Sequence, residues 1–143
     1  MIRRCNVGDF DAVLRLLRQL WPDKQLDAAQ LRVVYEQVLT SDSQFYLCAI
    51  EDENLVGFGS LSVRSSLWEA GCLGHIDELV VDEMHRQRGI GTRLLLALIE
   101  LAKENGCGRI ELDSAFHRAA AHKFYESQGF ENRAYLFSKP IGG

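Results

Sequence analysis

Proline is scarce in this sequence, since its 143 residues include only Pro22 and Pro140. Proline removes a backbone donor and interrupts helices and central strands, so its scarcity leaves most of the chain free for regular secondary structure. No repeat, low-complexity tract or Pro/Gly-rich linker divides the chain, and its length suits one compact domain. We therefore expect a single domain over residues 1–143.

Closely spaced cysteines and long apolar runs are also absent. The four cysteines include no C-x-x-C pair, no stretch approaches the roughly 18 apolar residues of a membrane span, and the first residues show no secretory pattern. We therefore expect no membrane partner, a cytoplasmic location and reduced, mostly buried thiols. These thiols belong to Cys5, Cys48, Cys72 and Cys107.

Positive charge is not in excess, because 16 lysines and arginines face 20 aspartates and glutamates, a net charge of -4. A protein that binds nucleic acid usually presents a basic face, so the composition argues against such a partner and is compatible with a cationic one. The four histidines show no spacing typical of metal ligands, and we predict no metal site. They are His75, His85, His117 and His122.

Apolar periodicity predicts a mixture of helices and strands. Helices are expected at 9–21, at 27–39, from the glycine pair near residue 90 to Asn105-Gly106, and at 119–127. Strands are expected at 2–5, 45–50, 55–63, 76–81, 109–113 and 135–138. A hairpin followed by alternating strands and helices predicts an α/β or α+β fold with a mixed sheet.

The segment 80–94 carries the strongest functional pattern. It leaves an apolar strand, crosses a polar connection and opens a helix at Gly89 and Gly91, with Arg86 and Arg88 beside them. The first helical turn offers unpaired N–H groups and partial positive charge, which suits a diphosphate. The P-loop pattern is absent, and the dinucleotide pattern lacks its third glycine. The spacing by itself also fits a helix start without a ligand.

Three stretches together resemble the Gcn5-related N-acetyltransferase (GNAT) superfamily. Arg86–Gly91 is similar to its [RQ]-x-x-G-x-[GA] motif, Ile76–Val81 to its central strand, and Ala121–Phe130 to its A-x-x-[FL]-Y-x-x-x-G-F segment. They stand in the family's order, and the likeness covers nearly the whole chain. The resemblance implies a single-domain fold with a mixed central sheet of about six or seven strands flanked by about four helices. It also implies an acyltransferase that uses acetyl-CoA.

The resemblance implies how the cofactor is held. In the family, backbone amides of the glycine loop hold the pyrophosphate of coenzyme A, and free backbone groups of the preceding strand bind the pantetheine arm. Arg118, which stands where the family often has asparagine, is a further candidate for a phosphate. The cofactor residues expected are Leu79, Val80, Val81, Arg86, Gln87, Arg88, Gly89, Ile90, Gly91, Thr92 and Arg118.

Acyl transfer to an amine requires the neutral amine, yet an alkylammonium has a pKa near ~10, so a general base is needed. Asp77 and Glu78 are the candidates, and regular strand alternation would place them on opposite faces. The resemblance to family members that acetylate polyamines and aminoglycosides favours Asp77, with Glu78 second. Tyr125 matches the family's tyrosine near the thioester sulfur and is the expected general acid. Packing beside Phe124 is the alternative explanation of this tyrosine.

The resemblance places the acceptor amine between two loops, Trp21–Leu26 and Ser65–Gly74. Trp21, Asp23, Trp68 and Glu69 could give a cationic amine apolar and acidic contacts. Trp21 is equally expected to close the first helix against the core. Residues 17–22 resemble a stretch of some aminoglycoside N-acetyltransferases.

Three functions remain open at this point, because a fold does not by itself define a substrate. The first is acetyl transfer to a small amine such as a polyamine, an aminoglycoside or an amino-acid-like metabolite. The second is acetylation of protein lysines or N-termini, and the third is non-catalytic acyl-CoA binding. The absence of an extra recognition domain favours the first. The length of the acyl group is open, and a homodimer is one compatible assembly.

Overall fold

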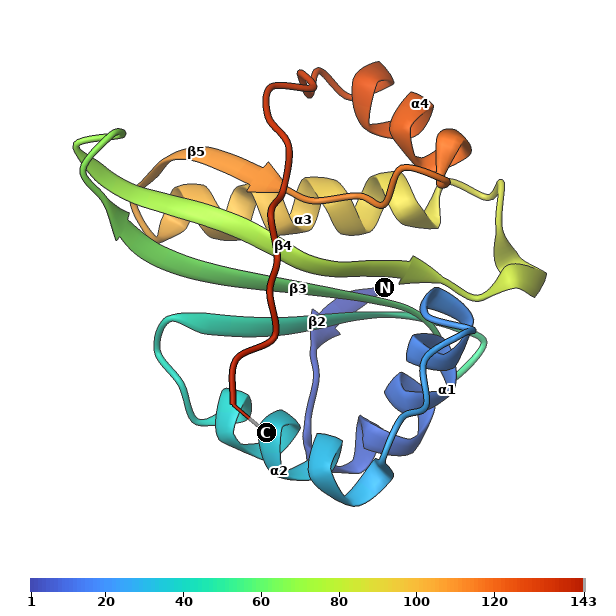
Figure 1. Cartoon of the computed structure of the whole chain (residues 1–143). Helices are drawn as coiled ribbons and strands as arrows, with labels where there is room; N and C mark the ends of the chain where they lie inside the picture. Colours follow the sequence, from blue (N-terminus) through green and yellow to red (C-terminus); the bar gives the residue numbers. More distant parts are fainter. Residues whose placement is uncertain (143) are drawn as a thin grey trace. The chain divides into compact units, whose positions relative to one another are not determined.

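The computed structural model describes residues 1–142 and divides into two compact units, Met1–Glu111 and Leu112–Gly143 (Figure 1). The first unit contains nearly all regular structure, and the second contains one helix, α4 (Ala119–Ser127). The elements before α4 are β1 (Ile2–Arg4), η1 (Val7–Asp9), α1 (Phe10–Leu20), α2 (Ala28–Leu39), β2 (Gln44–Glu51), β3 (Asn54–Ser66), β4 (Gly71–Val81), η2 (Glu83–His85), α3 (Ile90–Glu104) and β5 (Cys107–Leu112). Within residues 1–142, no helix has the length and apolar character needed to cross a bilayer.

The strands form one sheet in the order β1-β2-β3-β4-β5. The pairs β1–β2, β2–β3 and β3–β4 are antiparallel, whereas the arrows of β4 and β5 point the same way in Figure 1. The sheet is therefore mixed, as expected. A two-residue turn joins β2 to β3, where Asp52 and Glu53 have φ angles of 48° and 65° between the paired residues Glu51 and Asn54. Positive φ at both positions is the geometry that tight hairpins need.

Two sequence-based expectations about strands were wrong. The sheet of the described chain has five strands rather than six or seven, because residues 135–138 form no strand and 130–142 contain no regular element. A β-like pattern becomes a strand only where a neighbour pairs with it, and Tyr135 and Phe137 are instead 76% and 92% exposed. The expected loop over 65–74 is also much shorter, since β3 and β4 extend to form a long hairpin whose tip is 67–70.

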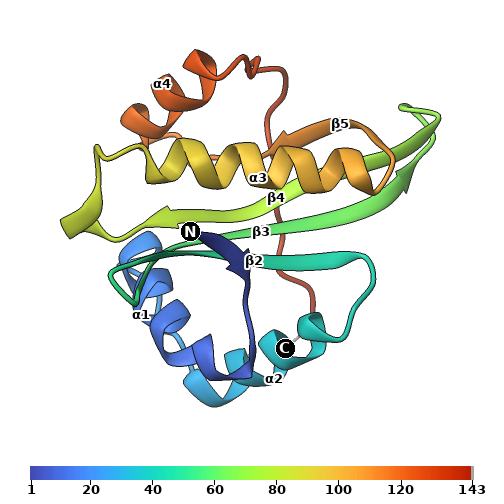
Figure 2. The ribbon, with the colours of Figure 1, turned by 180° about the vertical axis from the view of Figure 1, so that it is seen from behind.

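Helices cover the two faces of the sheet within the first unit. Figure 2 shows α1 and α2 on one side of the sheet and α3 on the other. The α3 face depends on glycine, because a Cβ atom on Gly57 would lie 2.7 Å from a Leu94 methyl and one on Gly59 would lie 2.9 Å from a Leu98 methyl. Both leucines are completely buried. The glycines therefore let α3 pack directly on the backbone of β3.

An irregularity in β4 shifts which side chains share a face. Ser60 pairs with Glu78, but the next residue of β3, Leu61, pairs with Ile76, so Asp77 is an extra residue in β4. Such a bulge interrupts the alternation of side chains along a strand. Tyr46 of β2 is opposite Ser60, and Ser60 is opposite Glu78, so these three residues lie in one row across the sheet.

Candidate active site

A hollow of about 360 Å³ lies where α2 meets the bulged part of the sheet. Its residues come from α2, β2, β3 and β4, and two of them are the carboxylates proposed as bases. Apolar walls alternate with groups that can form hydrogen bonds. The lining residues are Val34, Val38, Gln44, Tyr46, Leu61, Ser62, Asp77 and Glu78.

The placement of Asp77 and Glu78 on opposite faces, expected from regular alternation, was wrong. Both carboxylates line the same hollow. The bulge is the physical reason, because one extra residue resets the alternation and turns Glu78 to the side that holds Ser60 and Tyr46. Geometry therefore allows the two acids to act on one bound molecule.

Glu78 is the more buried of the two acids and is held by a single serine. Ser60 Oγ donates a hydrogen bond to Glu78 Oε1 at 2.6 Å, and the Glu78 N–H donates to Ser60 Oγ at 2.8 Å. Burial raises the pKa of Glu78 above its ordinary value of 4.5, the Ser60 hydrogen bond opposes that change, and the charge of Asp77 adds to it. A carboxylate of raised pKa in a hollow is a stronger proton acceptor than a solvated one.

Asp77, the neighbour of Glu78, has a different environment. Its side chain is 39% exposed, and its Oδ1 lies 2.9 Å from His75 Nδ1 and accepts a hydrogen bond from Ser62 Oγ at 3.3 Å. When His75 is protonated, this contact is an ion pair. The two neighbouring carboxylates thus differ in burial and in hydrogen-bond partners, which suits two different roles.

Tyr46 is a lining residue that sequence reasoning did not find. Its ring stacks on Tyr35 at a centroid distance of 5.3 Å and meets the Phe58 ring edge-on at 5.2 Å. Burial and then the charges of Glu78 and Asp77 raise the pKa of Tyr46 to about 12, so its phenol stays protonated at neutral pH. Only the pairing of β2 with β3 brings Tyr46 beside the two carboxylates. The register of that pairing shifts between Ala49 and Ile50.

The glycine loop follows β4 and has the backbone geometry of an anion site. Gln87 and Gly89 have φ angles of 65° and 78°, and α3 begins directly afterwards. The Arg93 N–H is the first intrahelical donor and binds the Gly89 carbonyl at 3.0 Å, so the amides of residues 90–92 have no acceptor within the helix. Arg86 Nε donates to the Val81 carbonyl at 3.3 Å, which ties the turn to the end of β4.

The last residues of β4 pair with β3 on one side. Leu79 is opposite Gly59, Val80 opposite Phe58, and Val81 opposite Gly57. On the other side of β4, Figure 1 shows β5 ending before the carboxyl end of β4. A pantetheine arm could form main-chain hydrogen bonds with the part of the β4 edge that β5 leaves uncovered. That contact stays a prediction.

The residues predicted to contact the acceptor lie outside the hollow. At the tip of the β3–β4 hairpin, the Arg109 guanidinium lies 5.0 Å from the centre of the Trp68 ring, and its Nε lies 3.3 Å from Glu69 Oε2. Trp21 packs against the core, and its backbone N–H donates to the Leu17 carbonyl at 2.9 Å, which closes α1. Asp23 is exposed. The structure therefore does not bring these four predicted residues to the hollow.

Tyr125 and Arg118 belong to the second unit. The Tyr125 ring is 9% exposed and meets the rings of Phe124 and Phe130 edge-on at 5.4 and 5.9 Å. Burial raises the pKa of Tyr125, and Arg118 at the start of α4 opposes that change. The phenol is therefore a proton donor at neutral pH that also packs among aromatic rings, and its role as general acid stays a prediction.

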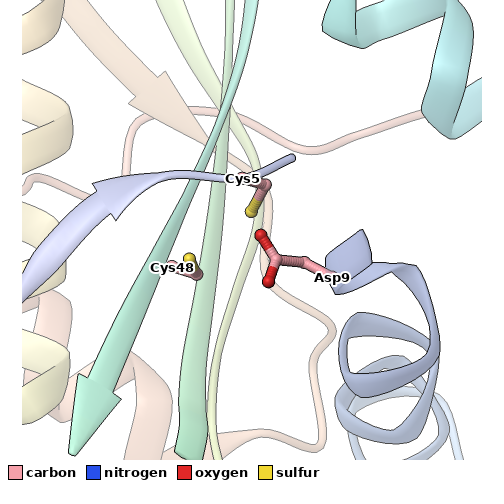
Figure 3. A group of neighbouring side chains, drawn as sticks. All are labelled: Cys5, Asp9 and Cys48. Carbon is pink, nitrogen blue, oxygen red and sulfur yellow. The ribbon is translucent and has the colours of Figure 1, made fainter. Parts of the chain in front are cut away.

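A second cluster of ionisable groups lies between β1, β2 and η1 (Figure 3). The Sγ atoms of Cys5 and Cys48 and a carboxylate oxygen of Asp9 lie within 4.8 Å of one another. Arg3 donates to both carboxylate oxygens of Asp9, at 2.7 and 3.0 Å, and Cys48 is completely buried. The carboxylate is thus already held by a guanidinium, which favours a structural role for the cluster.

The four cysteines are free thiols, as expected. Cys5 and Cys48 are buried, whereas Cys72 and Cys107 are partly exposed, so the expectation of mostly buried thiols holds for two of the four. Burial raises the pKa of Cys107, and the neighbouring Cys72 adds to that change.

Comparison with known proteins defines the family. The model of the Acetyltransferase (GNAT) family matches residues 10–130. The chain is 30% identical to an aminoalkylphosphonate N-acetyltransferase of Salmonella typhimurium, over 98% of this chain and 90% of that protein. It is 35% identical to a glucosamine 6-phosphate N-acetyltransferase of Trypanosoma brucei brucei, over 90% of this chain and 87% of that protein.

Solved structures agree with this fold over 99% of the chain. A putative acetyltransferase from Agrobacterium tumefaciens, also covered over 99%, has a TM-score of 0.88 at 26% identity. An aminoglycoside N-acetyltransferase in complex with CoA, covered over 95%, has a TM-score of 0.85 at 23% identity, which supports the fold alone.

These findings define the class of the protein. The chain belongs to the GNAT acetyltransferase family, as its three sequence motifs indicated. It is an acyltransferase whose acyl donor is acetyl-CoA, and coenzyme A is the product that leaves.

Proposed function

We propose that this protein transfers the acetyl group of acetyl-CoA directly to the primary amine of a small molecule bound in the hollow. The observation that carries the proposal is the meeting of Asp77 and Glu78 in one hollow on β4, the strand that leads into the glycine loop. A donor held at the end of β4 and an acceptor held beside its bulge would react without a covalent enzyme intermediate.

Glu78 is the general base in this proposal. The sequence favoured Asp77, but the partly buried carboxylate with the raised pKa is the better proton acceptor, and Ser60 fixes its orientation. The amine nitrogen forms a bond to the thioester carbonyl carbon and loses a proton to Glu78. The carbon–sulfur bond then breaks, and the coenzyme A thiolate leaves with the bonding electron pair.

Tyr125 is proposed to give the proton that converts this thiolate to the free thiol. Its protonated, buried phenol supports the role. Replacement of Tyr125 by phenylalanine should lower kcat about tenfold and leave acetyl-CoA affinity intact.

In the first unit, the proposed cofactor site comprises the edge of β4 at residues 79–81 and the loop 86–92; Arg118 of the second unit is a separate candidate for a phosphate contact. The amides at the start of α3 support the pyrophosphate contact. We also propose that residues 1–143 act as one acetyltransferase domain, since the family match at 10–130 crosses the boundary between the two units.

A small acceptor is favoured over a protein. The hollow of about 360 Å³ has the volume of a small-ligand site, and relatives of this chain are named for small amines. Acetylation of protein lysines or N-termini, and acyl-CoA binding without catalysis, are the alternatives that the experiments must separate.

Thermal unfolding tests the cofactor. Saturating acetyl-CoA should raise the Tm of the purified protein, because a ligand that binds only the folded state stabilises it. Nucleosides, which lack both the phosphates and the pantetheine arm, serve as the control and should raise Tm less. An unchanged Tm at saturating acetyl-CoA would refute the cofactor site.

Release of the coenzyme A thiol tests the reaction. A panel of small amines should release thiol faster than a lysine peptide or a peptide with a free N-terminus. Faster thiol release with the peptides would indicate that the acceptor is a protein rather than a small amine. A Tm increase with acetyl-CoA, but no thiol release with any acceptor, would indicate a module that binds acyl-CoA without catalysis.

A further inference from the structure

We infer that the hollow selects amines that carry a second positive charge, such as linear diamines and polyamines, over amines that carry phosphate or phosphonate. The inference rests on the proposed function, because it concerns the acceptor of that same site. It separates this chain from the two relatives described above, which are named for a phosphonate and a phosphate ester.

The charge of the lining carries the inference. The eight lining residues include two carboxylates and no lysine or arginine. A bound phosphate is normally held by guanidinium groups, ammonium groups or backbone amides, and a phosphate in this hollow would face Asp77 and Glu78. Like charges brought together away from bulk water repel strongly, so this lining disfavours an anionic acceptor.

The cations near the hollow in the first unit are either held by other groups or absent from the lining. Arg32 of α2 lies 3.5 Å from Asp11, 3.8 Å from Glu36 and over the Phe10 ring. Arg64 is two residues beyond Ser62 on β3, about 7 Å along the strand, and is exposed rather than part of the lining. The side chain of His75 is directed to Asp77.

The two carboxylates can divide the work on a diamine. Glu78, partly buried and held by Ser60, accepts the proton of the reacting nitrogen. Asp77, which is 39% exposed, remains to pair with the ammonium at the far end of the molecule. Val34 and Val38 of α2 form an apolar wall for the methylene groups between the two nitrogens.

Tyr46 adds to the preference for a cation. It lines the hollow next to both carboxylates, and an aromatic ring with a neutral phenol attracts an ammonium group more than a phosphate. A phosphorylated sugar amine would instead place polar groups against this ring and the apolar wall.

Matched acceptors test the inference. With saturating acetyl-CoA, thiol release is measured for 1,5-diaminopentane, pentylamine, 2-aminoethylphosphonate and glucosamine 6-phosphate. We expect kcat/KM for the diamine to exceed that for pentylamine about fivefold, the effect of one partly exposed charge pair, and to exceed both anionic amines further. Faster release with either anionic amine overturns the inference and leaves the proposed function intact.

Failure of the proposed function gives a different result. If acetyl-CoA raises Tm and neither these four amines nor any other small amine of the panel releases thiol, the proposed function is refuted, and the inference falls with it. Equal kcat/KM for the diamine and pentylamine overturns the inference alone.

The role of Asp77 is tested by Asp77→Asn. This change should raise KM for 1,5-diaminopentane about fivefold more than KM for pentylamine, because only the diamine has an ammonium group for Asp77 to pair with. Asp52→Asn is the control, since it makes the same change in the exposed β2–β3 turn. An equal rise of KM for both amines in Asp77→Asn overturns the assignment.

Discussion

The glycine loop and the hollow share β4 but are built in different ways. The loop at residues 86–92 is a continuous segment whose backbone conformation, with positive φ at Gln87 and Gly89, prepares amides for an anion. The hollow takes its residues from α2, β2, β3 and β4, and its chemistry lies in side chains.

The difference explains how one family can keep a cofactor and change its acceptor. Main-chain recognition tolerates many side chains as long as the backbone conformation is kept, and we propose it for the apolar residues Leu79, Val80 and Val81. Side-chain recognition changes with every substitution in the lining. We therefore expect loop variants to alter cofactor affinity and hollow variants to alter turnover and acceptor choice.

The largest effect is expected from Glu78→Gln. Loss of the proposed base should lower kcat about a hundredfold, while the Tm increase caused by acetyl-CoA stays as in the unchanged protein. Steady-state thiol release measures the first quantity and thermal unfolding the second. Glu53→Gln, the same change in an exposed turn, is the control. Full turnover in Glu78→Gln would exclude Glu78 as the base and leave Asp77 as the remaining candidate.

The pH dependence of kcat/KM should sharpen the assignment. The base acts when deprotonated, so kcat/KM should fall about tenfold for each pH unit below the pKa of Glu78, which burial raises above its ordinary value. Ser60→Ala removes a hydrogen bond that lowers this pKa and should move the acidic limb to higher pH. Asp77→Asn removes a charge that raises it and should move the limb to lower pH. If both variants moved the acidic limb in the same direction, or if neither moved it, the assignment of Glu78 as the base would be contradicted.

The smallest effect is expected in the loop, from Gly89→Ala. The added Cβ would meet no atom within 4 Å, so the cost arises from the φ angle of 78° and amounts to about 1 kcal/mol. If that strain loosens the amides of the loop, the Kd of acetyl-CoA rises about fivefold with little change in kcat. Gly106→Ala imposes the same strain at φ 81° at the other end of α3 and should leave Kd unchanged. A Kd that rises equally in both variants would mean that the loop has no special role.

Much of the fold follows from local patterns. Apolar periodicity located α1, α2, α3 and α4 within a few residues, and the polar turn at 52–53 located the β2–β3 hairpin. The pattern at 135–138 failed because a strand needs a partner, and no local signal states whether a partner is present. The ends of β3 and β4 failed for a related reason, since pairing between the two strands extends each beyond its apolar run.

The sequence by itself determined the family, the cofactor and the position of the loop that precedes α3, because each depends on a contiguous motif whose backbone conformation is set locally. Only the tertiary structure decided which side chains meet the acceptor. The register shifts beside Asp77 and Ala49, produced by pairing between distant strands, place Tyr46, Ser60 and Glu78 in one row. A bulge of one residue reverses the face of every side chain beyond it, and its position depends on the partner strand rather than on the neighbouring residues.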